Sequence, residues 1–336
     1  MTTRRRVVLV GLGGVGRRVA SLLGTRADAD VVAAWSRRPD HHGLPLAQLA
    51  PGCDEGVRVA ADLADALAAG ADVAIVATTS RLRDVGPQLR SCLEAGLHVI
   101  TTAEEAAQPW AAELEVAQSL DALARERGVT ILGCGVNPGF VFDALVITLA
   151  GASARVDRVA VERIVDLGRF SPAVQRRIGI GHTAEGFAAG KAAGDITGHI
   201  GFPQSMRVVA HALGRPIDRI DSTIEPTITS VRLDGGTMPV DAGTSAGFVQ
   251  RYLGYDGDEA WIEARLTGHV DFASAGLRRR DEIWIHGEPD LHLLIDPGLD
   301  AQATVTAVVT NSINRVCEAE PGWRTVADLP PAHATV

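Results

Sequence analysis

The chain has 336 residues, of which 46% are apolar and 22% charged, a composition typical of a globular protein large enough for two domains. Its formal net charge is −9, from 32 basic and 41 acidic residues, and it has no sustained basic stripe, which argues against a nucleic-acid-binding protein. Its four cysteines are scattered without metal-ligand spacing, so we expect neither a disulfide framework nor a metal.

The N-terminal residues imitate a signal peptide, because the basic residues 4–6 precede an apolar run. The run ends at Gly11, which makes it too short for the hydrophobic region of such a peptide. No other stretch approaches the ~18 apolar residues that a membrane span needs. We therefore expect a cytoplasmic protein without a membrane partner.

From residue 7 to about residue 135, short β-branched runs alternate with Ala- and Leu-rich stretches, a pattern typical of βαβ units. The expected strands are residues 7–10, 31–35, 73–77, 99–102 and 129–132. The expected helices are residues 14–23, 63–69, 83–95 and 109–127. Right-handed crossovers between these elements predict a doubly wound parallel sheet of the Rossmann type in an α/β protein.

A glycine-rich turn follows the first expected strand. Residues 11–16 read G-L-G-G-V-G and match the dinucleotide-binding pattern G-x-G-x-x-G at the start of a helix. In that pattern the glycines allow a tight turn, close approach of the backbone to a pyrophosphate, and close packing of helix on strand. We therefore expect a cofactor at Gly11, Gly13, Gly14, Val15 and Gly16, the alternative being a glycine-rich turn without a ligand.

The end of the second expected strand lacks the acidic residue that usually hydrogen-bonds the ribose of NAD. Ser36, Arg37 and Arg38 stand there instead. Because a guanidinium forms bidentate, charge-assisted hydrogen bonds with phosphate, these residues favour NADP over NAD. NAD remains an alternative, since exposed arginines also occur without a ligand.

Residues just after the later strands are expected beside the nicotinamide, because ligands of such sheets bind at the carboxyl ends of the strands. The expected cofactor contacts are Thr78, Thr79, Thr101, Asn137 and Pro138. Glu104 and Glu105 bring carboxylates to this edge, where an apolar pocket raises a carboxyl pKa into the range useful for proton transfer. Alternatively, the two acids only start a helix.

After residue 139 the pattern changes to long strand-like runs at 156–165 and 261–270, which predict a second domain of the α+β type. The glycine-rich region 179–201 is interpreted as a substrate loop or a surface connection. An amphipathic segment at 303–317 is expected to pack on the first domain. We thus predict one domain from residues 1–140 and 303–336, and a second from residues 141–302.

Three segments resemble a known family. They are residues 98–105 (HVITTAEE), 135–140 (GVNPGF) and 198–201 (GHIG). They are similar to the dihydrodipicolinate-reductase-like group that contains 2,4-diaminopentanoate dehydrogenases and native amine dehydrogenases. The resemblance covers nearly the whole chain. It implies that Glu104 or Glu105 handles protons during reductive amination, that Asn137, Pro138 and Phe140 border the nicotinamide and the substrate, and that the protein is a homodimer.

Two differences limit this resemblance. Family members carry a His-Gly-Asp sequence after the last long strand, whereas residues 298–304 here read GLDAQAT, which puts the substrate range in doubt. The His-His pair followed by Lys and the Asp-Pro-Ser-Gly-Thr sequence of true dihydrodipicolinate reductases are absent. The lysine-pathway reaction is therefore a poor fit.

The hypothesis is an NADP(H)-dependent amine dehydrogenase that converts a small aldehyde or ketone and ammonia to an amine. The candidate substrate walls are Phe140, Phe142, Phe187 and Phe202. His182 and His199 are candidates for orienting the substrate, although each of these aromatic or imidazole side chains could equally be structural.

Two other functions fit the same sequence. The first is oxidative deamination of a diamine or an amino acid, as in 2,4-diaminopentanoate dehydrogenase, with Arg163 or Arg169 meeting an anionic substrate group. The second is a non-catalytic NADPH-binding sensor. The charge of the preferred substrate distinguishes the first of these functions from the main hypothesis. Turnover of amines distinguishes the main hypothesis from the second.

Overall fold

The computed structural model describes residues 4–334, so residues 1–3 of the N-terminal segment and residues 335–336 of the C-terminal segment lie outside the described residues. Two compact units make up the chain. One comprises residues 1–145, 207–209 and 301–336, and the other comprises residues 146–206 and 210–300. No helix among the described residues combines the length and the apolarity that crossing a membrane requires.

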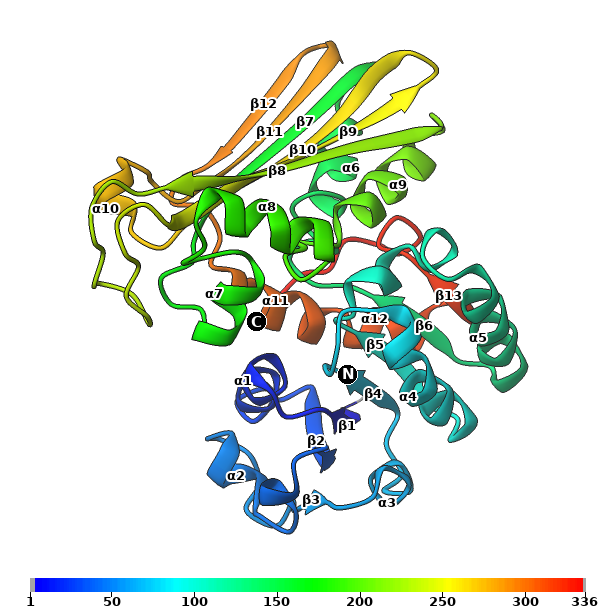
Figure 1. Ribbon diagram of the computed structural model, residues 1–336. Helices are drawn as coiled ribbons and strands as arrows, with labels where there is room; N and C mark the ends of the chain where they lie inside the picture. The colour runs from blue at the N-terminus through cyan, green and yellow to red at the C-terminus, as the bar shows by residue number, and fades with distance from the viewer. Residues whose placement is uncertain (1–3, 335–336) are drawn as a thin grey trace. The chain divides into compact units, whose positions relative to one another are not determined.

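The first unit contains a parallel sheet in the order β13-β6-β5-β4-β1-β2-β3 (Figure 1). Its strands are β1 (Arg5–Val10), β2 (Ala29–Trp35), β3 (Val59–Ala60), β4 (Val73–Val76), β5 (His98–Thr101), β6 (Thr130–Gly133) and β13 (Gly322–Arg324). Its helices are α1 (Gly14–Leu23), η1 (Pro39–His41), α2 (Leu46–Leu49), α3 (Leu63–Leu67), α4 (Leu82–Glu94), η2 (Glu104–Ala107), η3 (Pro109–Ala111), α5 (Leu114–Arg127), α11 (Ala301–Asn311) and α12 (Ile313–Glu318). The predicted doubly wound Rossmann sheet is confirmed.

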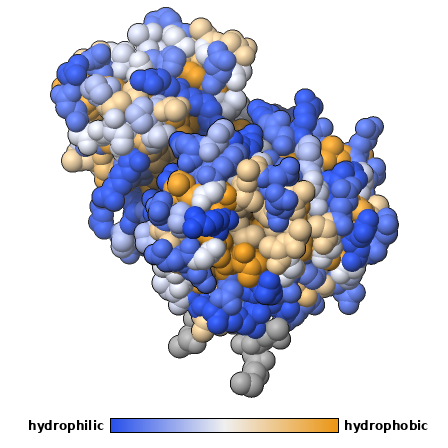
Figure 2. Space-filling view, turned by 90° about the horizontal axis from the view of Figure 1, so that it is seen from below, coloured by the Kyte–Doolittle hydropathy of each residue, from blue (hydrophilic) through white to orange (hydrophobic). Residues whose placement is uncertain are grey.

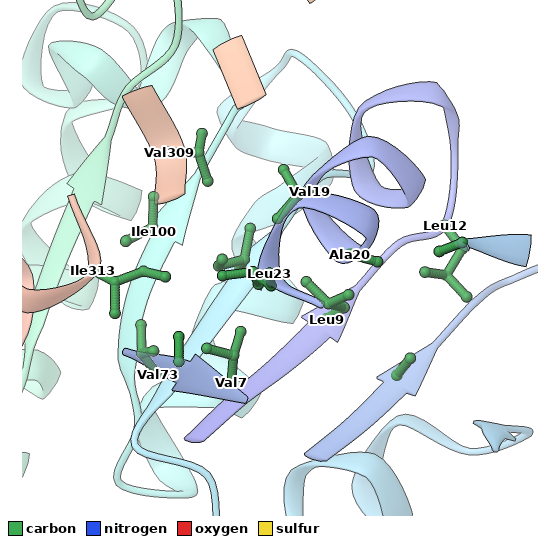
Figure 3. Close-up of a cluster of buried hydrophobic side chains, with 14 of the residues drawn as sticks. Val7, Leu9, Leu12, Val19, Ala20, Leu23, Val73, Ile100, Val309 and Ile313 are labelled. Carbon is green, nitrogen blue, oxygen red and sulfur yellow. The ribbon is translucent and has the colours of Figure 1, made fainter. Parts of the chain in front are cut away.

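Alternate residues of the central strands face opposite sides of this sheet, and each side is covered by helices. Val7 and Leu9 of β1 belong to one buried cluster with Val19 of α1, Val309 of α11 and Ile313 of α12 (Figure 3). Side chains of α3, α4 and α5 cover the other side. This double burial explains why the strands are almost continuously apolar in sequence.

The second unit is built on a six-stranded sheet in the order β12-β11-β7-β10-β9-β8. Its strands are β7 (Arg155–Asp166), β8 (Arg219–Ile228), β9 (Ser245–Asp256), β10 (Glu259–His269), β11 (Arg280–Glu288) and β12 (Leu291–Ile295). The other helices of the chain are α6 (Ala144–Ala150), α7 (Pro172–Arg177), α8 (Ala184–Ala193), α9 (Phe202–Leu213) and α10 (Phe272–Ala275). Because β7 and β10 run parallel while the other pairs are antiparallel, the sheet is mixed, and the predicted α+β type is confirmed.

Three expected segments differ in the structure. The helix expected at 109–127 begins at Leu114, because the backbone of Glu113 is not helical and separates α5 from η3. The segment expected at 303–317 is divided at Ser312, whose hydroxyl donates to the carbonyl of Val308. The region 179–201 is not simply a loop, because α8 occupies its centre.

Charged and polar residues take up much of the molecular surface. Figure 2 shows a face on which hydrophilic side chains alternate with smaller hydrophobic patches. Such patches are ordinary on folded proteins, because polar side chains do not suffice to cover the whole surface.

Candidate active site

The glycine-rich turn joins β1 to α1, and two of its glycines are needed for the fold. Gly11 has a φ of +103°, and a Cβ atom there would lie 2.6 Å from the carbonyl oxygen of Ala77. A Cβ atom on Gly16 would collide with the carbonyl oxygen of Gly11. Only glycine allows the backbone to pass this closely.

The other two glycines leave an open surface at the start of α1. A Cβ atom on Gly13 or Gly14 would meet no protein atom within 4 Å, and both residues are exposed. No side chain caps the helix N-terminus, where the first backbone N–H groups lack helical acceptors. This combination of open backbone and uncapped amides fits the pyrophosphate of a dinucleotide.

Ser36, directly after β2, is buried rather than exposed. Its Oγ lies 3.0 Å from Nδ1 of His41 and accepts a hydrogen bond from the backbone N–H of Arg38 at 3.2 Å. Nε2 of His42 lies 2.9 Å from the carbonyl oxygen of Ser36. The serine therefore shapes the turn after β2 from inside.

The arginines after Ser36 are exposed. Arg38 binds Asp40 through two hydrogen bonds of 3.0 and 3.3 Å, and this contact holds the pKa of the Asp40 carboxyl below its usual value. Arg37 forms no ion pair with any residue among 4–334. Burial lowers the pKa of His41; the charge of Asp40 opposes this shift, and the charges of Arg38 and Arg17 act in the same direction as burial. Positive charge therefore collects around the turn.

The threonines expected at the strand ends differ in exposure. The Thr78 hydroxyl donates to Oε1 of Gln88 at 2.6 Å, and Thr79 is partly exposed. Thr101 is fully buried, and its hydroxyl accepts from the backbone N–H of Ala103 at 3.2 Å. Its side chain thus stabilises the turn that leads to Glu104.

Glu104 and Glu105 begin η2, a single 3-10 turn rather than an α-helix. Oε2 of Glu105 accepts a 2.7 Å hydrogen bond from the backbone N–H of Leu82, the first residue of α4, and Oε1 lies 3.8 Å from a guanidinium nitrogen of Arg81. Glu105 therefore caps α4, where a carboxylate also interacts favourably with the helix dipole. Glu104 is half-buried at the start of the same turn.

The turn after β6 is tightly organised. Asn137 and Pro138 are joined by a cis peptide bond, and Gly139 has a φ of +125°. The buried carboxylate of Asp143 accepts hydrogen bonds from the backbone N–H groups of Gly139 at 2.7 Å and Ala144 at 2.8 Å. Phe140 packs on the core cluster of the first unit and Phe142 is buried.

In the second unit, His199 belongs to a polar and aromatic cluster. The Gln250 amide accepts from the backbone N–H of His199 at 2.9 Å and donates to its carbonyl oxygen at 3.2 Å. Nδ1 of His199 accepts from the N–H of Gly201 at 3.1 Å, and the ring lies 4.6 Å from that of Phe202. Phe202 in turn packs edge-on against Tyr252.

The remaining expected substrate residues of the second unit are dispersed. His182 is partly exposed at the start of α8, and Phe187 is buried against Gly179. Arg163 is only 1% exposed, because its guanidinium pairs with Asp281 at 2.5 Å and donates to the carbonyl oxygen of Leu299 at 2.9 Å. A buried ion pair thus occupies the guanidinium of Arg163, which was expected to meet an anionic substrate group.

Sequence reasoning did not single out Arg17, His41, Gln250 or Trp323. A signal for Arg17 was present, because it follows the last glycine of the turn directly. Gln250 and Trp323 act through contacts between distant segments, which no local pattern reveals, whereas His41 contacts Ser36 in its own turn. Among the described residues, no three His, Cys, Asp or Glu side chains come together in a way that could hold a metal ion.

Two family models match the chain. One, described as the 2,4-diaminopentanoate dehydrogenase C-terminal domain, covers residues 140–336, and the other, an oxidoreductase family with an NAD-binding Rossmann fold, covers residues 5–135. The 2,4-diaminopentanoate dehydrogenase of Acetoanaerobium sticklandii is 32% identical over 97% of this chain and 93% of its own. The chain belongs to the 2,4-diaminopentanoate dehydrogenase family. The predicted resemblance is thus confirmed, and the chain is an oxidoreductase with an NAD(P)-binding domain.

Solved structures agree with this family assignment. An amine dehydrogenase from Mycobacterium smegmatis superposes with a TM-score of 0.86 and is 27% identical, covering 99% of this chain and 98% of its own. A dihydrodipicolinate reductase from Paenisporosarcina sp. TG-14 has a TM-score of 0.51 at 17% identity, covering 96% of this chain and 98% of its own. The second similarity reflects a shared fold alone.

Proposed function

We propose that this chain is an NADP(H)-dependent amine dehydrogenase that aminates a small aldehyde or ketone with ammonia and, in reverse, deaminates the amine. The observation that separates the two candidate proton-transfer residues is the capping of α4 by Glu105, whose Oε2 lies 2.7 Å from the backbone nitrogen of Leu82. Because that carboxylate already has a structural role, we assign proton transfer to its neighbour Glu104. The family and the amine dehydrogenase from M. smegmatis support the reaction class.

The cofactor would be held by the turn at Gly11–Gly16 and by the positive residues after β2. The open surface at Gly13 and Gly14 fits the pyrophosphate, and Thr78, Thr79, Asn137 and Pro138 belong to the strand ends where a nicotinamide would lie. When bound, the nicotinamide supplies hydride in the reductive direction and takes it up in the oxidative one.

Glu104 would act as the general base and acid. In the reductive direction its carboxylate takes a proton from ammonium, so that neutral ammonia attacks the carbonyl carbon and forms a carbinolamine. The carboxylic acid then returns a proton as water leaves, which gives the iminium. Overall, the carbonyl compound, ammonium, one proton and the reduced cofactor give the protonated amine, water and the oxidised cofactor.

Preference for NADP rests on Arg37 and Arg38. Arg37 is exposed without an ion pair among the described residues, and the exposed pair of Arg38 with Asp40 contributes little stability in water. A 2′-phosphate, with its higher charge and three oxygens, would compete well for both guanidiniums.

Oxidation of a diamino acid is the second candidate, favoured by the identity to 2,4-diaminopentanoate dehydrogenase. The burial of Arg163 with Asp281 weighs against it, because that guanidinium cannot meet a substrate carboxylate without breaking the pair. Of the two arginines expected to meet an anionic substrate group, Arg169 is the one that is exposed.

We also propose a homodimer formed through the outer face of the six-stranded sheet. Cross-strand ion pairs occupy this face, including Arg251 with Glu263 at 2.6 Å and Arg265 with Glu162 at 3.4 Å. Trp284 and the exposed Leu294 add apolar surface to it. Sedimentation equilibrium measures the oligomeric state.

Glu104→Gln tests the catalytic assignment, with Glu105→Gln as the matched control. The amide introduced by Glu104→Gln keeps the shape of the side chain but cannot take up the proton, so kcat for ammonia-dependent NADPH oxidation should fall roughly 100-fold or more. In Glu105→Gln the amide oxygen can still accept from the N–H of Leu82, so kcat should stay within about threefold of wild type. NADPH affinity, measured by fluorescence titration, should change in neither variant.

Near-full activity of both variants would contradict the proton-transfer role and favour the non-catalytic NADPH sensor. A large loss only in Glu105→Gln would exchange the two assignments. Substrates should be screened as aldehydes, ketones and keto acids with ammonia, because the charge of the preferred substrate separates the two candidate reactions.

A further inference from the structure

The turn that carries Glu104 is fixed on one side by the α4 region. Glu105 binds the N–H of Leu82, and its own backbone N–H donates to the carbonyl oxygen of Ser80 at 3.2 Å. Ser80 lies just before α4, and Leu82 is the first residue of α4. They hold the beginning of η2 but not its end.

The other side of the turn is fixed by a residue from the far end of the chain. The indole N–H of Trp323 donates to the carbonyl oxygen of Ala106 at 3.1 Å. Trp323 is 2% exposed, and Ala106 is fully buried. The hydrogen bond therefore forms out of contact with water, where loss of its donor leaves the carbonyl unsatisfied.

Trp323 is itself held rigidly. It lies in β13, where it pairs with Ile131 of β6, and its backbone N–H donates to a carboxylate oxygen of Asp121 at 2.7 Å. Its ring packs edge-on against Trp110 with the ring centres 6.4 Å apart. The backbone of Ala106 also lies so close to Gly133 that a Cβ atom there would collide with it. The end of η2 is thus enclosed between β6 and β13.

We propose that Trp323 is a positioning residue for the reaction, acting through the Ala106 carbonyl to fix the turn that presents Glu104. The inference rests on the proposed function of Glu104. Proton transfer requires heavy atoms about 2.6 to 3.2 Å apart, so a small displacement of the turn lowers the rate.

The test removes the indole N–H while keeping the ring. Benzothienylalanine at position 323 replaces the N–H by sulfur in a side chain of nearly the same shape, and Trp323→Phe is the genetically simpler variant. We expect kcat to fall about three- to tenfold, as for loss of one hydrogen bond. KM for the carbonyl compound and NADPH affinity should stay unchanged. Trp261→Phe, which removes a comparable buried indole hydrogen bond to the carbonyl oxygen of Pro216 in the second unit, is the control and should leave kcat unchanged.

A double-mutant cycle with Glu104→Gln decides whether Trp323 acts through Glu104. In the Glu104→Gln background the change at position 323 should have no further effect on kcat. Hydrogen exchange should become faster in residues 103–111 and stay unchanged in α5.

An equal loss of kcat in both backgrounds, or no loss in either, would refute the inference while leaving the proposed function intact. So would a change in NADPH affinity that accounts for the lost rate. Full activity of Glu104→Gln alone would instead refute the proposed function, and this inference with it. Thermal unfolding of each variant separates these outcomes from loss of fold.

Discussion

Arg37 and Arg38 are adjacent in the chain but have different surroundings. The Arg38 pair with Asp40 is exposed, with 61% and 62% of the two side chains accessible, so a phosphate can displace the carboxylate at little cost. Arg37 has no ion pair among the described residues to lose. The two guanidiniums are therefore suited to bind one phosphate together.

Replacing both with alanine should weaken NADPH binding about tenfold or more, because charge-assisted hydrogen bonds contribute ~1.5 to 3 kcal/mol. NADH binding should change less than about twofold, since it lacks the 2′-phosphate. Isothermal titration with both nucleotides measures the difference. Arg90→Ala with Arg127→Ala removes the same charge from other exposed positions and should affect neither. Equal losses for both nucleotides in the Arg37/Arg38 variant would contradict the assignment.

Residue types at the candidate site could be predicted from motifs, but their partners could not. The two glutamates are equivalent in sequence, and only the approach of α4 to η2 distinguishes Glu105 from Glu104. Arg163 was expected to meet an anionic ligand, because its actual partner, Asp281, lies 118 residues away in the sequence and cannot be recognised from it. Ser36 was expected to face a phosphate, whereas its hydroxyl is buried beside His41. The differences at Glu105 and Arg163 come from tertiary contacts that leave no local trace, whereas the one at Ser36 comes from the conformation of its own turn.

At the scale of the elements, different glycines of the turn between β1 and α1 are needed for folding and for cofactor binding. Gly13 has φ −75° and ψ −164°, a conformation open to any residue, and a Cβ atom there meets no protein atom within 4 Å. Gly13→Val should therefore fold with a Tm close to wild type and yet lose detectable binding of NADPH and NADH. Titration and thermal unfolding of the same preparation test both statements.

Gly16→Val is the contrasting variant. Its side chain would collide with the carbonyl oxygen of Gly11, so Tm should fall clearly. If folded Gly13→Val bound NADPH with wild-type affinity, the turn would not be the phosphate site.

The elements that sequence predicted best are those with a long, uniform pattern. The five expected strands of the Rossmann sheet are present, because burial on both faces makes them continuously apolar. The short strands β3 and β13 were not predicted, because two or three residues are too few to show a periodic pattern. In α8, Gly186 and Gly190 lower helix propensity, although Thr183 caps its start and Gly194 its end. A Cβ atom on Gly190 would lie 2.8 Å from the side chain of Ile196, a contact made only in the folded chain.

At the scale of the whole molecule, buried or half-buried histidines link stability to pH: His41, described above, and one more in each unit. Nδ1 of His98 accepts from the N–H of Thr130 at 3.2 Å, and Nδ1 of His269 accepts from the N–H of Asp271 at 3.0 Å. Burial lowers the pKa of both side chains. Arg5 lowers the pKa of His98 further, against Asp72. Protonation at Nδ1 would also remove the acceptor from each backbone N–H.

The direction of the pH effect follows from the lowered pKa values. As pH falls below about 6.5, the unfolded chain binds protons at these histidines before the folded chain does, so the free energy of unfolding decreases. The free energy of unfolding stops decreasing from this cause once the pH is below the pKa values that these histidines have in the folded chain. Above about 6.5 both states are neutral at these positions, and the contribution to stability is fully present.

His98→Asn and His269→Asn isolate this contribution. The asparagine carbonyl can accept from the same backbone N–H groups but does not titrate, so each variant should lose less stability than wild type between about pH 7.5 and about pH 5.5. Urea unfolding at the two pH values measures the difference. His333→Asn, at an exposed position, should retain the wild-type dependence. If all three variants lost as much stability as wild type on acidification, the buried imidazoles would not be the groups that take up the protons.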